Sequence, residues 1–170
     1  MCDKDILENQ ALDFLKMINS REFNLIDLGA GDGSKTRIFI GQAIKHGYDV
    51  TYIPVDISYH ANIDLINACS EEYPDLKMKA LTGEFEDGLD WIKKNTKNKN
   101  VFLFPGSTFG NEGEEKNIGF LQKMYELMKK EDQFFLGLDM WKDPDTIARA
   151  YMDNEMKTAF MLNILDRINK

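Results

Sequence analysis

Residues 23–33 read Phe-Asn-Leu-Ile-Asp-Leu-Gly-Ala-Gly-Asp-Gly, an apolar run that ends in alternating glycines. The run is typical of a buried strand, and the glycines permit a tight turn in which a ligand can lie against bare backbone. Apolar residues at helical spacing follow from Ser34 to about His46, so the turn joins a strand to a helix. Asp56 lies 23 residues beyond Gly33, near the roughly 20-residue spacing of an acid that binds ribose. The stretch predicts a nucleotide-type ligand site, with a purely structural glycine turn as the alternative.

One helix is expected before this stretch, and strands alternate with helices after it. The expected strands cover residues 23–28, 50–55, 77–81, 101–104 and 134–140. The expected helices cover the first twenty residues, 34–46, Ser58 to just before Pro74, 87–97, 114–130, and about 145 to the end. This alternation predicts an α/β fold with a doubly wound, mostly parallel sheet, Rossmann-like and truncated to about five strands. Right-handed crossovers predict the strand order 3-2-1-4-5, and the length fits a single domain over residues 1–170.

Charge and composition argue against several classes of partner. The chain has 21 Lys and Arg against 29 Asp and Glu, a net charge of −8, which disfavours nucleic acid and anionic membrane surfaces. No apolar stretch reaches the roughly 18 residues of a membrane span, and the acidic N-terminus lacks the charge pattern of a signal peptide. Cys2, Cys69, His46 and His60 are too scattered for a metal site. We therefore expect a cytoplasmic protein without a bound metal.

The pattern of the glycine turn narrows the ligand. A dinucleotide-binding turn reads GxGxxG, with its third glycine where Ser34 stands, whereas this one reads GxGxG and carries Asp27 and Asp32. Acids repel a pyrophosphate but suit a cationic ligand without phosphate. S-adenosylmethionine, which carries an ammonium and a sulfonium group, is such a ligand. Two Tyr-x-x-x-Lys matches, at 73–77 and 125–129, lie away from the position that a dehydrogenase would need.

Several motifs resemble one known family. Residues 25–37, Leu-Ile-Asp-Leu-Gly-Ala-Gly-Asp-Gly-Ser-Lys-Thr-Arg, resemble the first motif of the histidine-specific methyltransferases, which include the L-histidine N-alpha-methyltransferases of the ergothioneine pathway. The most distinctive match is Phe-Pro-Gly-Ser-Thr-Phe-Gly-Asn at 104–111. Further matches lie at residues 52–58, 81–85, 136–144, 150–151 and 160–169. The resemblance covers roughly residues 22–169 and implies a class I methyltransferase fold with S-adenosylmethionine as the cofactor.

The resemblance also implies site residues. Those expected to bind the cofactor are Asp27, Gly29, Gly31, Gly33, Lys35, Asp56, Glu84, Phe85 and Gly106. Those expected to contact the substrate are Asn111, Tyr151 and Phe160. Asp27 would accept from the ammonium group, Asp56 from the ribose hydroxyls, and the pair at 84–85 would contact adenine, although the family usually has aspartate where Glu84 stands. Helix capping by Asp56 or Asn111, a structural role for Asp27, and plain packing of Phe85, Tyr151 or Phe160 are the alternatives.

The activity implied is S-adenosylmethionine-dependent N-methylation of an amino acid, histidine first, or of another small amine. Such a transfer mainly requires alignment of a neutral amine with the methyl carbon, so no catalytic acid or base is expected. The alternative is a non-catalytic or partner-dependent S-adenosylmethionine-binding domain, because the family's imidazole-reading part has no counterpart among these residues. The apolar strand expected at 134–138 and the closing helix predict a homodimer or a docked partner segment at an uncovered sheet edge.

Overall fold

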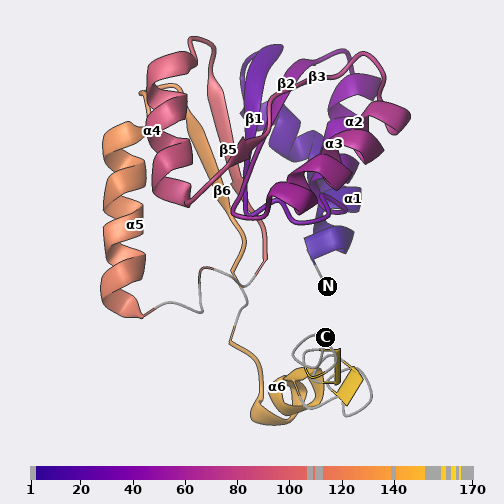
Figure 1. Cartoon of the computed structure of the whole chain (residues 1–170), viewed down its shortest axis with the longest axis vertical. Helices are drawn as coiled ribbons and strands as arrows, with labels where there is room; N and C mark the ends of the chain where they lie inside the picture. Colours follow the sequence, from indigo (N-terminus) through magenta and orange to yellow (C-terminus); the bar gives the residue numbers. More distant parts are fainter. Residues whose placement is uncertain are drawn as a thin grey trace. The chain divides into compact units, whose positions relative to one another are not determined.

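The computed structural model describes residues 3–106, 109, 113–138, 141–151, 158–159, 162–163 and 165. The chain forms two compact units, residues 1–138 and 139–170. In the first unit, a sheet lies between two groups of helices (Figure 1). The expectation of a single domain over the whole chain stays a prediction.

The sheet of the first unit consists of parallel strands. They are β1 (Glu22–Leu28), β2 (Asp49–Asp56), β3 (Lys77–Met78), β4 (Leu81–Thr82), β5 (Asn100–Phe104) and β6 (Gln133–Leu136). Their order is β3-β2-β1-β5-β6, and β4 also pairs with β2. The predicted doubly wound fold is confirmed, with β5 and β6 as the fourth and fifth expected strands. β6 ends at Leu136 rather than near residue 140, because Leu136 pairs with Phe104, the last residue of β5.

The expected third strand, residues 77–81, is divided into β3 and β4. Both pieces keep one register on β2, with Met78 opposite Tyr52 and Leu81 opposite Val55. Between these pairs β2 carries Pro54, which has no N–H to donate. The ladder is therefore interrupted at residues 79–80, and the sheet has six strands where about five were expected.

Helices cover both faces of the sheet, because successive strand residues point to opposite sides. The helices of this unit are α1 (Asp3–Met17), α2 (Thr36–Lys45), α3 (Tyr59–Glu72), α4 (Phe85–Asn95) and α5 (Glu114–Leu127). One face buries Leu25 and Tyr52 with residues of α1, α2 and α3, and the other buries Ile26 and Ile53 with residues of α4 and α5 (Figure 1). The expected helices of this unit are present, with ends that differ by a few residues.

The second unit contains α6 (Pro144–Tyr151). The Thr146 N–H donates to Asp143 Oδ1 at 2.9 Å, so Asp143 caps the helix and Pro144 takes its first position. Residues 158–159, 162–163 and 165 are also helical.

Across the described parts of both units, no helix combines the length and the apolar character that crossing a membrane requires. Within the same residues, no group of three or more His, Cys, Asp or Glu is placed to hold a metal ion.

Candidate cofactor site at the carboxyl end of the sheet

The glycine turn between β1 and α2 is held by the neighbouring strand. Gly29, Gly31 and Gly33 have φ angles of 72°, 55° and 63°, a region that glycine enters at little cost. The Gly29 N–H donates to the Val55 carbonyl at 2.9 Å, and the Gly33 N–H donates to the Ala30 carbonyl at 2.9 Å. The turn therefore continues the ladder between β1 and β2 and then folds sharply into α2.

Two glycines of the turn meet different surroundings. A Cβ on Gly33 would lie 2.2 Å from Leu65 Cδ1, so the absence of a side chain lets the turn rest on α3. A Cβ on Gly31 would meet no atom within 4 Å. The backbone at Gly31 is thus open to an approaching ligand, whereas Gly33 is needed for packing.

Asp56, at the end of β2, ties the glycine turn to the start of α3. The Gly31 N–H donates to Asp56 Oδ2 at 3.0 Å, and the Ser58 N–H donates to Oδ1 at 2.9 Å. The N-cap of α3 is Ser58, whose Oγ accepts from the Ala61 N–H at 3.2 Å. Asp56 is half-buried, and each carboxylate oxygen can accept more than one hydrogen bond. The side chain can therefore hold the turn and accept from ligand hydroxyls at the same time.

Asp27 precedes the first glycine by two residues and is buried, with 1% of its surface exposed. The Tyr52 hydroxyl donates to Asp27 Oδ2 at 2.8 Å, and Oδ1 has no hydrogen-bond partner among the described residues. Burial raises the pKa of Asp27 from 3.8 to about 6, and the charge of Asp56 adds to the rise. The Thr36 side chain, the hydrogen bond from Tyr52 and the charge of Lys35 act against it. A buried acceptor without a partner is a place where a donor is favourable.

We expect the substitution Asp27→Asn to stabilise the ligand-free protein more at pH 8 than at pH 5. The pKa of Asp27 is about 6 in the folded chain and 3.8 in a model carboxyl. Protonation of Asp27 therefore stabilises the folded chain. This contribution to the free energy of unfolding is complete below pH 3.8 and is lost as the pH rises through 6. The complete loss corresponds to about 3 kcal/mol, of which about half arises above pH 5. Urea unfolding at both pH values measures the difference, and an equal effect of Asp27→Asn at both would contradict the raised pKa.

The segment between β4 and α4 is fastened beside Asp56. Asn62 Nδ2, in a side chain that is almost fully buried, donates to the Leu81 carbonyl at 3.1 Å and to Thr82 Oγ1 at 2.9 Å. The Gly83 N–H donates to the Asp56 carbonyl at 3.1 Å. The next residue, Glu84, takes the N-cap position of α4 and is exposed. Glu84 and Phe85, the pair expected to contact adenine, therefore lie at the same end of the sheet as the glycine turn.

Phe85 opens α4 and is partly buried. A Cβ on Gly29 would lie 3.5 Å from Phe85 Cζ, so the ring borders the glycine turn. The ring also lies edge to face with Phe104, at 5.4 Å between centroids, and with Phe120, at 6.3 Å. Phe85 therefore belongs to the core and borders the turn, and both interpretations of this residue fit its position.

The remaining expected site residues are placed less completely. Gly106 follows β5 with a φ of 102°, at the same end of the sheet as the glycine turn. Lys35 immediately precedes α2. Tyr151 is the last residue of α6, in the second unit, and its side chain is not among the described groups. Asn111 and Phe160 lie outside the described residues, so the substrate-binding residues stay predictions.

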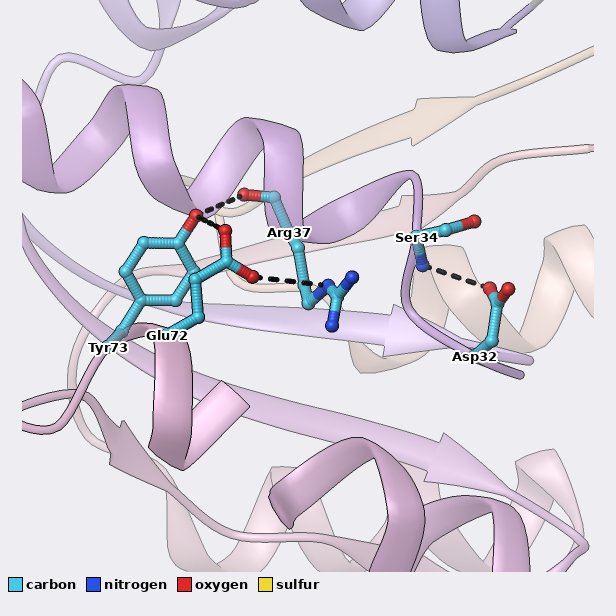
Figure 2. A network of polar contacts seen from close by, with 5 residues as sticks. All are labelled: Asp32, Ser34, Arg37, Glu72 and Tyr73. Carbon is cyan, nitrogen blue, oxygen red and sulfur yellow. Dashed lines mark hydrogen bonds and ion pairs between the residues drawn. The ribbon is translucent and has the colours of Figure 1, made fainter. Parts of the chain in front are cut away.

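Figure 2 shows how the helix that follows the turn is anchored. Near the end of the turn, the Ser34 N–H donates to Asp32 Oδ1 at 2.9 Å, which lowers the pKa of Asp32. In the first turn of α2, Arg37 Nε lies 3.5 Å from Glu72 Oε2. The Tyr73 hydroxyl lies 2.8 Å from Glu72 Oε1 and 3.2 Å from the Arg37 carbonyl oxygen. The start of α2, which follows the glycine turn, is thereby joined to the end of α3.

Two further residues, Tyr52 and Asn62, hold this end of the sheet together and were not expected from the sequence. Both side chains carry polar groups and are buried. A buried tyrosine or asparagine usually has a hydrogen-bond partner, so each indicates that a polar contact exists. The partners are Asp27 for Tyr52 and the β4 backbone for Asn62, and both come from distant parts of the chain.

The residues together fit a cationic ligand that has hydroxyl groups and no phosphate. Asp56 has acceptor capacity left for a ribose, and the space over Gly31 is open. Asp27 Oδ1 lacks a donor among the described residues. The charges of Asp27, Asp32 and Asp56 around the turn favour a cation. These are the requirements of S-adenosylmethionine.

Comparison with known proteins agrees with S-adenosylmethionine as the ligand. A profile of the histidine-specific, S-adenosylmethionine-dependent methyltransferases matches residues 1–170. The histidine N-alpha-methyltransferase of Mycobacterium tuberculosis (strain CDC 1551 / Oshkosh) is 31% identical over 151 residues, 88% of this chain and 46% of that protein. A 4-dimethylallyltryptophan N-methyltransferase of Claviceps fusiformis is 28% identical over 159 residues, 88% of this chain and 44% of that protein. The chain spans about half the length of these curated relatives.

Solved structures with low sequence identity to this chain share the fold. An S-adenosylmethionine-dependent methyltransferase from Clostridium acetobutylicum ATCC 824 matches with a TM-score of 0.54 and 12% identity, over 77% of this chain and 48% of that chain. The cyclopropane synthase MmaA2 from Mycobacterium tuberculosis matches with a TM-score of 0.51 and 14% identity, over 88% of this chain and 50% of that chain. These similarities concern the sheet and its helices.

Proposed function

Because the chain belongs to the family of histidine-specific, S-adenosylmethionine-dependent methyltransferases, we propose that it transfers a methyl group from S-adenosylmethionine to the amine of an amino acid. Histidine is the first candidate for the acceptor. The observation that carries the proposal is the hydrogen bond between Asp56 and the glycine turn. It lies at the carboxyl end of a parallel sheet, where open α/β sheets bind their ligands.

In this proposal the residues of the chain bind the cofactor and align the acceptor amine with it. S-adenosylmethionine, when bound, supplies a methyl group on a sulfonium. Asp56 accepts from the ribose hydroxyls while the Gly31 N–H fixes its orientation, and Phe85 lies against the adenine. Asp27 supplies negative charge for the cationic methionine end. The acceptor amine needs alignment rather than proton transfer at the moment of reaction, so no acid or base is assigned.

Two kinds of support favour an amino acid as the acceptor. The relatives are named for N-methylation of histidine and of 4-dimethylallyltryptophan, two amino acids with aromatic rings. Asn111 follows β5 in the sequence, and the resemblance to the family implies that it contacts the substrate. Its amide can donate and accept hydrogen bonds at once, as the amine and carboxylate of an amino acid require. We therefore propose an amino acid with an aromatic ring, with Tyr151 and Phe160 as further contacts.

The alternative of a non-catalytic or partner-dependent domain is not favoured, because the curated relatives are named as N-methyltransferases.

A methylation assay with the full chain and a panel of amino acids tests this function. We expect an N-methylated product from histidine or a tryptophan-type amino acid, detected by mass spectrometry. Asn111→Ala should lower turnover by about tenfold or more while leaving cofactor affinity unchanged, since its amide is expected to contact only the substrate. Cofactor binding without any product from the wild-type chain would contradict the proposed methyl transfer. Product formation that Asn111→Ala leaves intact would contradict the role of Asn111.

A further inference from the structure

The hydrogen-bonded pair of Asp27 and Tyr52 is built from two neighbouring strands. Tyr52, on β2, is fully buried and lies opposite Leu25 in the register with β1. Leu25 and Asp27 occupy the same face of β1, because strand side chains alternate. The Tyr52 ring therefore extends along this face toward the glycine turn, and its hydroxyl reaches Asp27 Oδ2 at 2.8 Å.

The Tyr52 hydroxyl serves as a donor at physiological pH. Burial, together with the charge of Asp27, raises the pKa of Tyr52 well above 10, so the hydroxyl keeps its proton. The hydrogen bond that it donates in turn lowers the pKa of Asp27. The other charged or titratable groups that face the pair are Lys35 and Arg37 at the start of α2, Asp56 at the end of β2, and Cys69 on α3.

A carboxyl group is a costly choice for a purely structural contact at this position. A buried carboxylate loses its hydration, and burial is the main cause of the raised pKa of Asp27. A neutral side chain could accept from the Tyr52 hydroxyl without this cost. What a carboxylate adds is a negative charge and a second oxygen, and Oδ1 has no partner among the described residues.

We propose that Tyr52 is a positioning residue for cofactor binding, whose hydroxyl holds Asp27 Oδ2 and leaves Oδ1 to serve the cationic methionine end of S-adenosylmethionine. Tyr52 acts through Asp27 and needs no contact with the ligand. This inference rests on the proposed function, because it requires S-adenosylmethionine to bind at the glycine turn. It makes the affinity for the cofactor depend on the protonation of Asp27.

Calorimetric titration of the full chain with S-adenosylmethionine tests this role. Tyr48→Phe is the matched control for Tyr52→Phe, because the Tyr48 hydroxyl donates to the Leu15 carbonyl at 3.3 Å near the opposite end of β2. We expect Tyr52→Phe to weaken binding by about tenfold at neutral pH, and Tyr48→Phe to leave it unchanged. Wild-type affinity should fall as the pH drops through about 6. Tyr52→Phe should show this fall at a higher pH, because losing the bond raises the pKa of Asp27.

The variant Asp27→Asn keeps the test decisive if Tyr52→Phe does not fold. It should weaken binding and remove the pH dependence, and Tyr52→Phe should have no further effect when added to it. A wild-type affinity that does not change with pH, or a Tyr52→Phe variant with unchanged affinity and pH profile, would overturn the positioning role alone. Absence of S-adenosylmethionine binding by the wild-type chain would overturn the proposed function as well.

Discussion

Replacement of Asp56 by alanine is expected to weaken S-adenosylmethionine binding by about tenfold to a hundredfold. The ribose hydroxyls would lose a charged acceptor, and hydrogen bonds to charged groups contribute about 1.5–3 kcal/mol. The N–H groups of Gly31 and Ser58 would lose the same carboxylate, so the glycine turn would also lose its tie to β2. Both effects act in the same direction, and calorimetric titration of the folded variant measures their sum.

Asp49→Ala is the matched control for this substitution. Asp49 begins the strand that Asp56 ends, and its exposed carboxylate pairs with Lys77 at 2.8 Å. Removing it eliminates one carboxylate from β2 without touching the glycine turn, so cofactor affinity should remain that of the wild-type chain. If Asp56→Ala also bound with wild-type affinity, Asp56 would not be the ribose acceptor.

Gly33→Ala is expected to cause the largest loss of stability among single changes in the turn, about 3 kcal/mol. The residue has a φ of 63°, where a side chain costs about 1–2 kcal/mol. The added Cβ would also lie 2.2 Å from Leu65 Cδ1. Leu65 is 1% exposed, so it has little room to move, and such overpacking costs about 1–3 kcal/mol. Urea unfolding of the ligand-free protein measures the loss.

Gly31→Ala separates the cost of the positive φ angle from the cost of the contact with Leu65. Its φ of 55° carries a similar backbone cost, but the added Cβ would meet no atom within 4 Å. We expect a loss of about 1 kcal/mol, together with weaker cofactor binding, because the methyl group would occupy the space open to the ligand. Equal losses of stability in Gly31→Ala and Gly33→Ala would show that Leu65 does not restrict the turn.

The parts of the site that the sequence predicts are those with a local signal. The strand, the glycine turn and α2 follow one another within a short stretch, so the residues of each element indicate its structure directly. Asp56 and Ser58 likewise stand where an apolar run gives way to a helical pattern. Their positions at the end of β2 and at the N-cap of α3 agree with the structure.

The contacts that the sequence does not predict join elements that are distant along the chain. The bond between Tyr52 and Asp27 depends on the register of β1 and β2, whereas periodicity reports burial without naming a partner. The interruption between β3 and β4 depends on Pro54 of a neighbouring strand. Gly33 is needed for packing because Leu65 of α3 lies against it, whereas Gly31 has no such neighbour and stays open to a ligand. Such relations come from tertiary packing.

Calorimetric titration of the folded wild-type chain with S-adenosylmethionine and with its demethylated product, S-adenosylhomocysteine, tests the cofactor site most directly. Both ligands carry the adenine, the ribose and the ammonium group that Phe85, Asp56 and Asp27 are proposed to serve. We expect saturable binding of both at one site per chain. Absence of binding of both ligands to the folded chain would contradict a cofactor site at the glycine turn.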